Sequence, residues 1–78
     1  MNLVTDNPLH RLTRGQRQVL RALHDSGWSY TDAAARLRMP ESSVRNAVSR
    51  AIVRAKVKDR SALAYWLGRE DEALAVDI

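Results

Sequence analysis

The clearest pattern of hydrophobic and polar positions lies in residues 41–56. Apolar side chains recur there at i, i+3, i+4, i+7, i+8 and i+11, which is the spacing of one face of an α-helix. They are Val44, Ala47, Val48, Ala51, Ile52 and Ala55. The side chains that turn away from this face are mostly polar: Ser42, Asn46, Ser49, Arg50 and Val53, with Arg45 and Arg54 on the flanks. The pattern predicts an amphipathic helix over residues 41–56.

A first helix is expected over residues 14–25. Thr13 followed by Gln16 fits a capping box, in which the two side chains satisfy two backbone N–H groups that the helix leaves unpaired. Gly27 follows the segment, and glycine readily adopts the left-handed conformation that ends helices.

A short second helix and a tight turn are expected before the helix over residues 41–56. Ser29 can cap the second helix, which ends near Arg38 because Pro40 cannot continue a helix interior. Short helix, turn and longer helix form the helix-turn-helix plan, which needs a small residue where the helices cross, here Ala34. Apolar side chains at suitable offsets for that crossing are Leu37, Met39, Val44 and Ala47.

The two ends of the chain differ from its middle. Residues 1–11 have no periodicity and are expected to form a flexible arm. Residues 12–69 are expected to form the folded domain, with Ser61 capping a last helix over residues 61–69. Residues 70–78 are expected to be an acidic tail. The predicted fold is therefore all-α, with four helices and a helix-turn-helix.

Composition excludes several classes of function. A chain of 78 residues without cysteine has no disulfide scaffold, thiolate metal site or cysteine nucleophile. His10 and His24 are isolated, so no catalytic centre, metal or cofactor is expected and the protein is not expected to be an enzyme. No apolar run approaches the roughly 20 residues of a membrane span, so the cytoplasm is the expected location.

Charge is unevenly distributed along the chain. The formal net charge is +4, from 13 Lys and Arg against 9 Asp and Glu. Residues 11–60 hold twelve basic and four acidic side chains, whereas residues 70–78 hold four acidic and no basic ones. A basic surface of this kind attracts polyanions such as nucleic acid, although a merely solvated charged surface explains the charge alone equally well.

The motifs resemble those of the LuxR/GerE-type DNA-binding domain. Residues 12–20 (LTRGQRQVL) are similar to its opening, residues 29–37 to its scaffold helix, and residues 41–46 (ESSVRN) to the start of its recognition helix. Residues 57–60 (VKDR) are similar to its step into a fourth helix. The family often has glycine where Arg38 stands, so the resemblance implies a left-handed or distorted backbone at Arg38.

A second resemblance points to region four of extracytoplasmic-function sigma factors. It is carried by residues 27–30 (GWSY), by Pro40-Glu41 and by residues 49–51 (SRA). That region also uses a helix-turn-helix, which reads the −35 promoter element while it touches RNA polymerase. The extension over residues 57–67 favours LuxR/GerE, and both resemblances imply DNA binding.

The resemblance to LuxR/GerE implies a sequence-specific transcriptional regulator that places residues 41–56 in the major groove of double-stranded DNA. The residues expected to contact bases are Arg45, Asn46, Ser49 and Arg50. Those expected to contact phosphates are Ser42, Ser43, Arg54, Lys56 and Lys58.

Partners other than DNA are expected on the same grounds. The fourth helix forms the dimer contact in many LuxR/GerE-type proteins, so a weak homodimer is expected through Leu63, Tyr65, Trp66 and Leu67. Tyr65 and Trp66 suit a second role equally well, which is to close the domain's own core. The alternative function is an interaction module that binds RNA polymerase, a sigma factor or another regulator. The ratio of 11 Arg to 2 Lys points to a bacterial or phage gene, so the expected location is the bacterial nucleoid.

Overall fold

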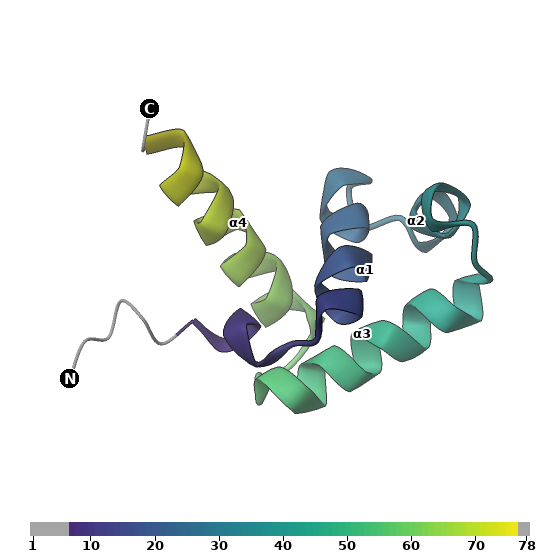
Figure 1. Ribbon diagram of the computed structural model, residues 1–78, viewed down its shortest axis with the longest axis horizontal. Helices are drawn as coiled ribbons and strands as arrows, with labels where there is room; N and C mark the ends of the chain where they lie inside the picture. The colour runs from purple at the N-terminus through teal and green to yellow at the C-terminus, as the bar shows by residue number, and fades with distance from the viewer. Residues whose placement is uncertain (1–6, 77–78) are drawn as a thin grey trace.

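The computed structural model describes residues 7–76, and every regular element in that range is a helix. The elements are a short 3-10 helix η2 (Pro8–Arg11), α1 (Arg14–Asp25), α2 (Tyr30–Leu37), α3 (Glu41–Ala55) and α4 (Arg60–Val76) (Figure 1). A tight turn joins α2 to the longer α3, and α1 stands between α2 and α4. The predicted all-α fold with four helices and a helix-turn-helix is confirmed.

The expected signals at the starts of α1 and α2 are present as hydrogen bonds. The hydroxyl of Thr13 accepts a hydrogen bond from the backbone N–H of Gln16 at 3.1 Å. The side-chain oxygen of Gln16 accepts one from the backbone N–H of Thr13 at 3.0 Å, which completes the capping box. At the start of α2, the hydroxyl of Ser29 accepts a hydrogen bond from the N–H of Asp32 at 3.2 Å. Both helix starts lie where the sequence predicted them.

Both helices of the helix-turn-helix end at a residue with a left-handed backbone. These residues are Arg38, with φ 56°, and Lys56, with φ 58°. The amide after Arg38 donates to the carbonyl of Ala34 at 3.1 Å, and the amide after Lys56 donates to the carbonyl of Ile52 at 3.2 Å. This is the Schellman pattern, which satisfies carbonyls at the helix end and usually places glycine in the left-handed position. The left-handed geometry expected at Arg38 is confirmed.

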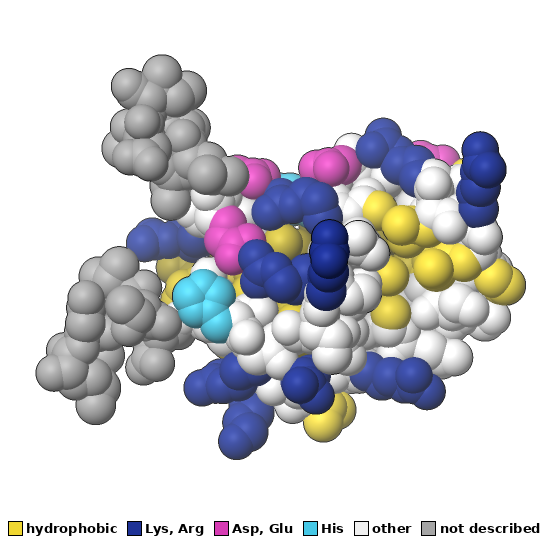
Figure 2. Space-filling model, in the orientation of Figure 1, with side chains coloured by type: hydrophobic (Ala, Val, Ile, Leu, Met, Phe, Trp, Pro, Cys, Tyr) yellow, Lys and Arg dark blue, Asp and Glu magenta, His cyan; other side chains and the backbone are white. Residues whose placement is uncertain are grey.

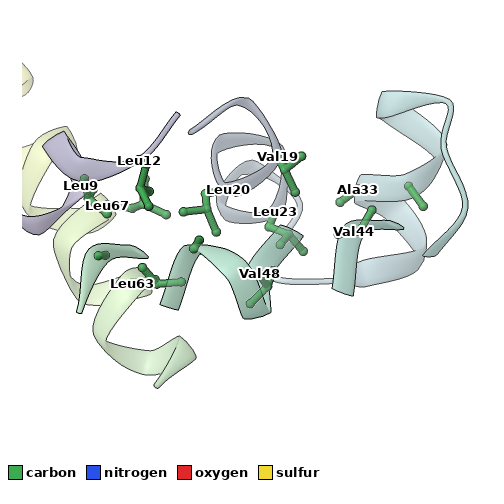
Figure 3. Close-up of a cluster of buried hydrophobic side chains, with 13 residues drawn as sticks. Leu9, Leu12, Val19, Leu20, Leu23, Ala33, Val44, Val48, Leu63 and Leu67 are labelled. Carbon is green, nitrogen blue, oxygen red and sulfur yellow. The ribbon is translucent and has the colours of Figure 1, made fainter. Parts of the chain in front are cut away.

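The hydrophobic core receives side chains from all five helices. The largest fully buried ones are Leu9 of η2, Leu20 and Leu23 of α1, Val44 of α3 and Leu63 of α4 (Figure 3). From α2 come only small buried side chains, Ala33 and Ala34, which let α3 approach closely. Around them, half-buried apolar side chains pack against the core, among them Leu37, Met39, Ala47 and Trp66.

The folded domain begins earlier than predicted. Pro8–Arg11 forms η2, and Leu9 is only 1% exposed, so the predicted arm over residues 1–11 is too long. The carbonyl of Leu9 accepts a hydrogen bond from the Arg17 guanidinium at 2.8 Å, and Arg11 donates to the carbonyl of Ala55 at 3.0 Å. These contacts join η2 to α1 and α3, and the periodicity of a short segment cannot predict them. Residues 1–6 of the predicted arm lie outside the described residues.

Most of the predicted acidic tail belongs to α4. This helix runs from Arg60 to Val76, whereas the sequence predicted a helix over residues 61–69 and a tail over residues 70–78. Residues 77–78 of that tail lie outside the described residues. Within the part of the chain that the structure describes, no helix is long and apolar enough to cross a bilayer.

Ion pairs hold the acidic part of α4 against α1. Glu70 lies 3.1 Å from the Arg17 guanidinium and 3.4 Å from that of Arg21. Asp71 lies 2.9 Å from Arg21 and 2.9 Å from the Nε2 of His24. The acidic side chains therefore neutralise basic groups of α1.

Candidate nucleic-acid interface

The outer surface of α3 is the candidate interface with nucleic acid. We call it the recognition face and define it by Ser42, Arg45, Asn46, Ser49, Arg50 and Val53. All six side chains are exposed, whereas Val44, Val48 and Ala51 on the opposite side of α3 are buried. In Figure 2, Lys and Arg side chains line the lower edge of the molecule, where α3 runs, and the visible acidic side chains lie above it. The recognition face is therefore polar and bordered by positive charge.

The four residues expected to contact bases lie together on the recognition face. Arg45, Asn46, Ser49 and Arg50 are all exposed and belong to consecutive turns of α3. At about 1.5 Å of rise per residue they span about 8 Å, the length of roughly two base-pair steps. Val53, which is 76% exposed, continues the same face and is its only large aliphatic side chain. This cluster presents hydrogen-bond donors, hydrogen-bond acceptors and one apolar group on a single exposed surface.

Arg45 is held in place by two residues, Tyr30 and Glu41, to which the sequence analysis assigned no contact with it. Its Cζ atom lies 4.4 Å from the ring centroid of Tyr30, the first residue of α2. Its Nη2 atom lies 3.5 Å from a carboxylate oxygen of Glu41, four residues earlier on α3. The i,i+4 spacing of Glu41 and Arg45 was visible in the sequence, but the contact with Tyr30 depends on how α2 crosses α3.

The residues expected to contact phosphates lie at the two ends of α3. Ser42 and Ser43 are exposed in its first turn, where free backbone N–H groups and the helix dipole favour an anion. Lys56 and Lys58 are exposed just beyond its last turn. Arg54 has a structural contact as well, because its Nε atom donates to the carbonyl of Arg11.

Arg11 is a basic residue near this end of α3 that sequence analysis missed. Its guanidinium reaches the carbonyl of Ala55 at 3.0 Å, so it lies beside the last turn of α3. Nothing in its local sequence indicated this position, since η2 is brought to α3 by the tertiary fold. Arg11 thus adds positive charge at the edge of the recognition face.

Two of the four predicted dimer contacts belong to the core instead. Leu63 is 0% and Leu67 3% exposed, and both pack with Leu9 and Leu12 inside the domain (Figure 3). They are unavailable to a second copy because they are buried in the core cluster of the domain. Tyr65 is 58% exposed, and Trp66 is half-buried against the core. A homodimer through α4 stays a prediction that now rests on Tyr65 and Trp66, and sedimentation velocity tests it.

A second surface feature lies away from the recognition face. It is a hollow of ≈ 470 Å³ between η2, α1, α2 and α4. Its apolar lining comes from Leu9, Leu12, Leu20, Ala22 and Leu67. Its charged lining residues are Arg14, Arg17, Arg21, Asp25 and Arg36, of which Arg17 and Arg21 are paired with acidic side chains of α4. Across residues 7–72, no group of three His, Asp or Glu side chains could hold a metal ion.

Comparison with known families agrees with this geometry. A family model described as sigma-70, region 4 matches residues 8–54, from the start of η2 almost to the end of α3. No curated protein and no solved structure matches the chain. Of the two resemblances drawn from the sequence, the match supports the one to region four and does not specifically support LuxR/GerE. All of α4 lies outside the matched residues.

Proposed function

This chain belongs to the sigma-70 region 4 family, whose model covers residues 8–54, and we propose that it is a sequence-specific DNA-binding transcriptional regulator. In this proposal α3 enters the major groove and α2 braces it across the turn. One observation carries the proposal above all. Every residue expected to read bases is exposed on a single face of α3, while the opposite face of the same helix is buried in the core.

Each group on the recognition face has a role in this proposal. Arg45 reads guanine through its guanidinium, and Asn46 reads adenine through its amide, because these side chains match the edges of those bases. Ser49 and Arg50 support the reading at neighbouring positions. The phosphate contacts from Ser42, Ser43, Arg54, Lys56 and Lys58 fix the register of α3 without reading sequence.

The distribution of charge supports the same orientation on DNA. Arg17 and Arg21 of α1 are paired with Glu70 and Asp71 of α4, so these four side chains together carry little net charge. Lys56 and Lys58 make no ion pair with any residue among those described. Positive charge without an ion-pair partner among the described residues is therefore present at the end of α3, where the proposal places phosphates.

Selection from a random pool of double-stranded DNA tests the proposed function. The wild-type protein should enrich a defined motif, and Asn46→Ala should lose preference at one base pair of that motif at a cost of about 1–3 kcal/mol. Gln18→Ala is a matched control, since Gln18 is exposed on α1 outside the recognition face. A wild-type protein that enriches no motif would refute sequence-specific binding.

The basic hollow on α1 favours a second function, docking onto another transcription protein. Region 4 domains of sigma factors bind both DNA and RNA polymerase, and the hollow offers apolar area beside Arg14 and Arg36, which make no ion pair among the described residues. Reversing the exposed charge with Arg36→Glu should weaken binding of RNA polymerase while the motif selected by the protein stays unchanged. Loss of both activities together would instead indicate that the variant has unfolded, which its thermal transition reports.

A further inference from the structure

The Arg45 side chain lies on a platform that α2 supplies. Tyr30 is half-buried and packs against the core, so its ring has a fixed position. The Arg45 guanidinium carbon is 4.4 Å from the centroid of that ring, within the range of a cation–π interaction. A planar guanidinium held by its face on a ring keeps its edges, where the N–H groups are, directed away from the ring.

Glu41 restrains the same guanidinium from a second direction. One oxygen of its carboxylate is 3.5 Å from Arg45 Nη2, and the other accepts a hydrogen bond from the Thr31 hydroxyl at 3.0 Å. Thr31 belongs to α2, so Glu41 is itself tied across the helix-turn-helix. Both restraints on Arg45 therefore depend on α2, although Arg45 belongs to α3.

Arg60, the first residue of α4, holds the far end of the platform. Its Nη1 atom donates to the Tyr30 hydroxyl at 3.3 Å, and its Cζ atom is 5.5 Å from the Tyr30 ring centroid. The same Cζ atom is 5.8 Å from the ring centroid of Trp28. The position of Tyr30 is thus fixed by contacts from outside α2 and α3 as well.

None of these restraints uses a hydrogen bond of Arg45. Among the described residues its guanidinium donates to no acceptor, because the contact with Glu41 is an ion pair at 3.5 Å and the contact with Tyr30 is through the ring face. The N–H donors of Arg45 are therefore not used in hydrogen bonds to any of the described residues. An arginine that is already ordered also loses less rotamer freedom on binding, which favours affinity and selectivity.

We propose that Tyr30 and Glu41 are positioning residues for base recognition, which hold the Arg45 guanidinium in the orientation that selects a guanine. This inference rests on the proposed DNA-binding function and adds to it residues outside the set expected to touch DNA. Arg50 provides the comparison. It lies on the same recognition face but makes no hydrogen bond, ion pair or ring contact with any of the described residues.

The first test measures the order of the guanidinium in the protein without DNA. Nitrogen-15 NMR relaxation of the side-chain Nε–Hε groups should give a higher order parameter for Arg45 than for Arg50. The substitution Tyr30→Leu should lower the order parameter of Arg45 to that of Arg50. Tyr65→Leu is the matched control, because Tyr65 also has an arginine over its ring, Arg69 at 6.0 Å, but is far from α3 in sequence. An Arg45 as mobile as Arg50 in the wild type, or unaffected by Tyr30→Leu, would overturn the proposal.

The second test measures base selection from a random DNA pool. Tyr30→Leu should relax preference at the same base pair as Arg45→Ala and weaken the best site about two- to fivefold, as the loss of a cation–π contact predicts. When Arg45→Ala is added to Tyr30→Leu, the further loss of affinity for the best site should be smaller than the loss that Arg45→Ala causes in the wild-type protein. Tyr30→Phe keeps the ring and should keep the preference. If Tyr30→Leu does not fold, Glu41→Gln removes the second restraint at a partly exposed site and should relax preference at that base pair.

The outcomes separate this inference from the function on which it rests. A wild-type protein that selects no motif would refute the proposed function and, with it, base recognition by Arg45. A preference that disappears in Arg45→Ala but survives fully in folded Tyr30→Leu and Glu41→Gln would refute the positioning role alone.

Discussion

Leu63→Ala tests whether α4 is an integral part of the domain, although α4 lies outside the residues that the family model matches. Leu63 is 0% exposed and packs among Leu9, Leu12 and Leu67 (Figure 3). Truncating a fully buried leucine costs about 2–5 kcal/mol, from lost burial and the cavity left behind. We expect about 3 kcal/mol, a large part of the roughly 4–12 kcal/mol available to a domain of this size.

Thermal unfolding followed by circular dichroism measures this effect. A loss of about 3 kcal/mol should lower the melting temperature by roughly 10–25 °C. The control is Tyr65→Ala on the same helix, which removes a side chain that is 58% exposed and should change stability by less than about 0.5 kcal/mol. If Leu63→Ala lowered the melting temperature no further than this control, α4 would not pack on the domain as described.

Three further predictions concern a helix end and the charges. Arg38→Gly should raise the free energy of unfolding by about 0.5–1 kcal/mol, because glycine adopts the left-handed backbone without the strain of a side chain. Urea unfolding measures this change, and a lower urea midpoint for the variant would contradict the left-handed geometry at Arg38. Glu70→Gln combined with Asp71→Asn should strengthen binding to DNA of random sequence at low salt, because arginines of α1 lose their ion-pair partners. Fluorescence anisotropy measures the affinity, and Glu72→Gln at an exposed position is the control. Equal affinities of the double variant and the control would contradict this prediction. Lys58→Ala should weaken binding to all sequences alike and reduce the slope of log affinity against log salt by about 1, and a loss confined to one motif would contradict a phosphate contact.

The parts of the fold that could be predicted from the sequence are those that local physics determines. The capping box of Thr13 and Gln16 and the cap at Ser29 depend only on residues three positions apart, and they lie where the sequence placed them. The buried stripe of α3 follows from helical periodicity alone. The left-handed end of α2 at Arg38 was expected from a different source, the resemblance to LuxR/GerE, in which glycine often stands at this position.

What the sequence did not reveal depends on contacts between distant segments. η2 is too short to show periodicity, and it is held by Arg17 of α1 and by α3. The second half of α4 contains an acidic run, which in the sequence alone resembles a solvated tail. The ion pairs of Glu70 and Asp71 form only because α1 lies beside α4 in the fold. The platform of Tyr30 under Arg45 likewise exists only once α2 and α3 have crossed. In each case a charged or apolar group finds its partner through the tertiary fold.

The ion pairs between α4 and α1 also affect how the domain would approach a duplex. Glu70 and Asp71 lie on the part of α4 that extends away from α3 (Figure 1). An excess of cationic side chains beside α3, where Lys56 and Lys58 make no ion pair among the described residues, would give the domain an electric dipole directed through α3. In the field of a polyanion such a dipole experiences a torque, which rotates the domain before any contact forms. More encounters with DNA would then begin with α3 facing the groove, and association would be faster than a uniformly charged surface allows.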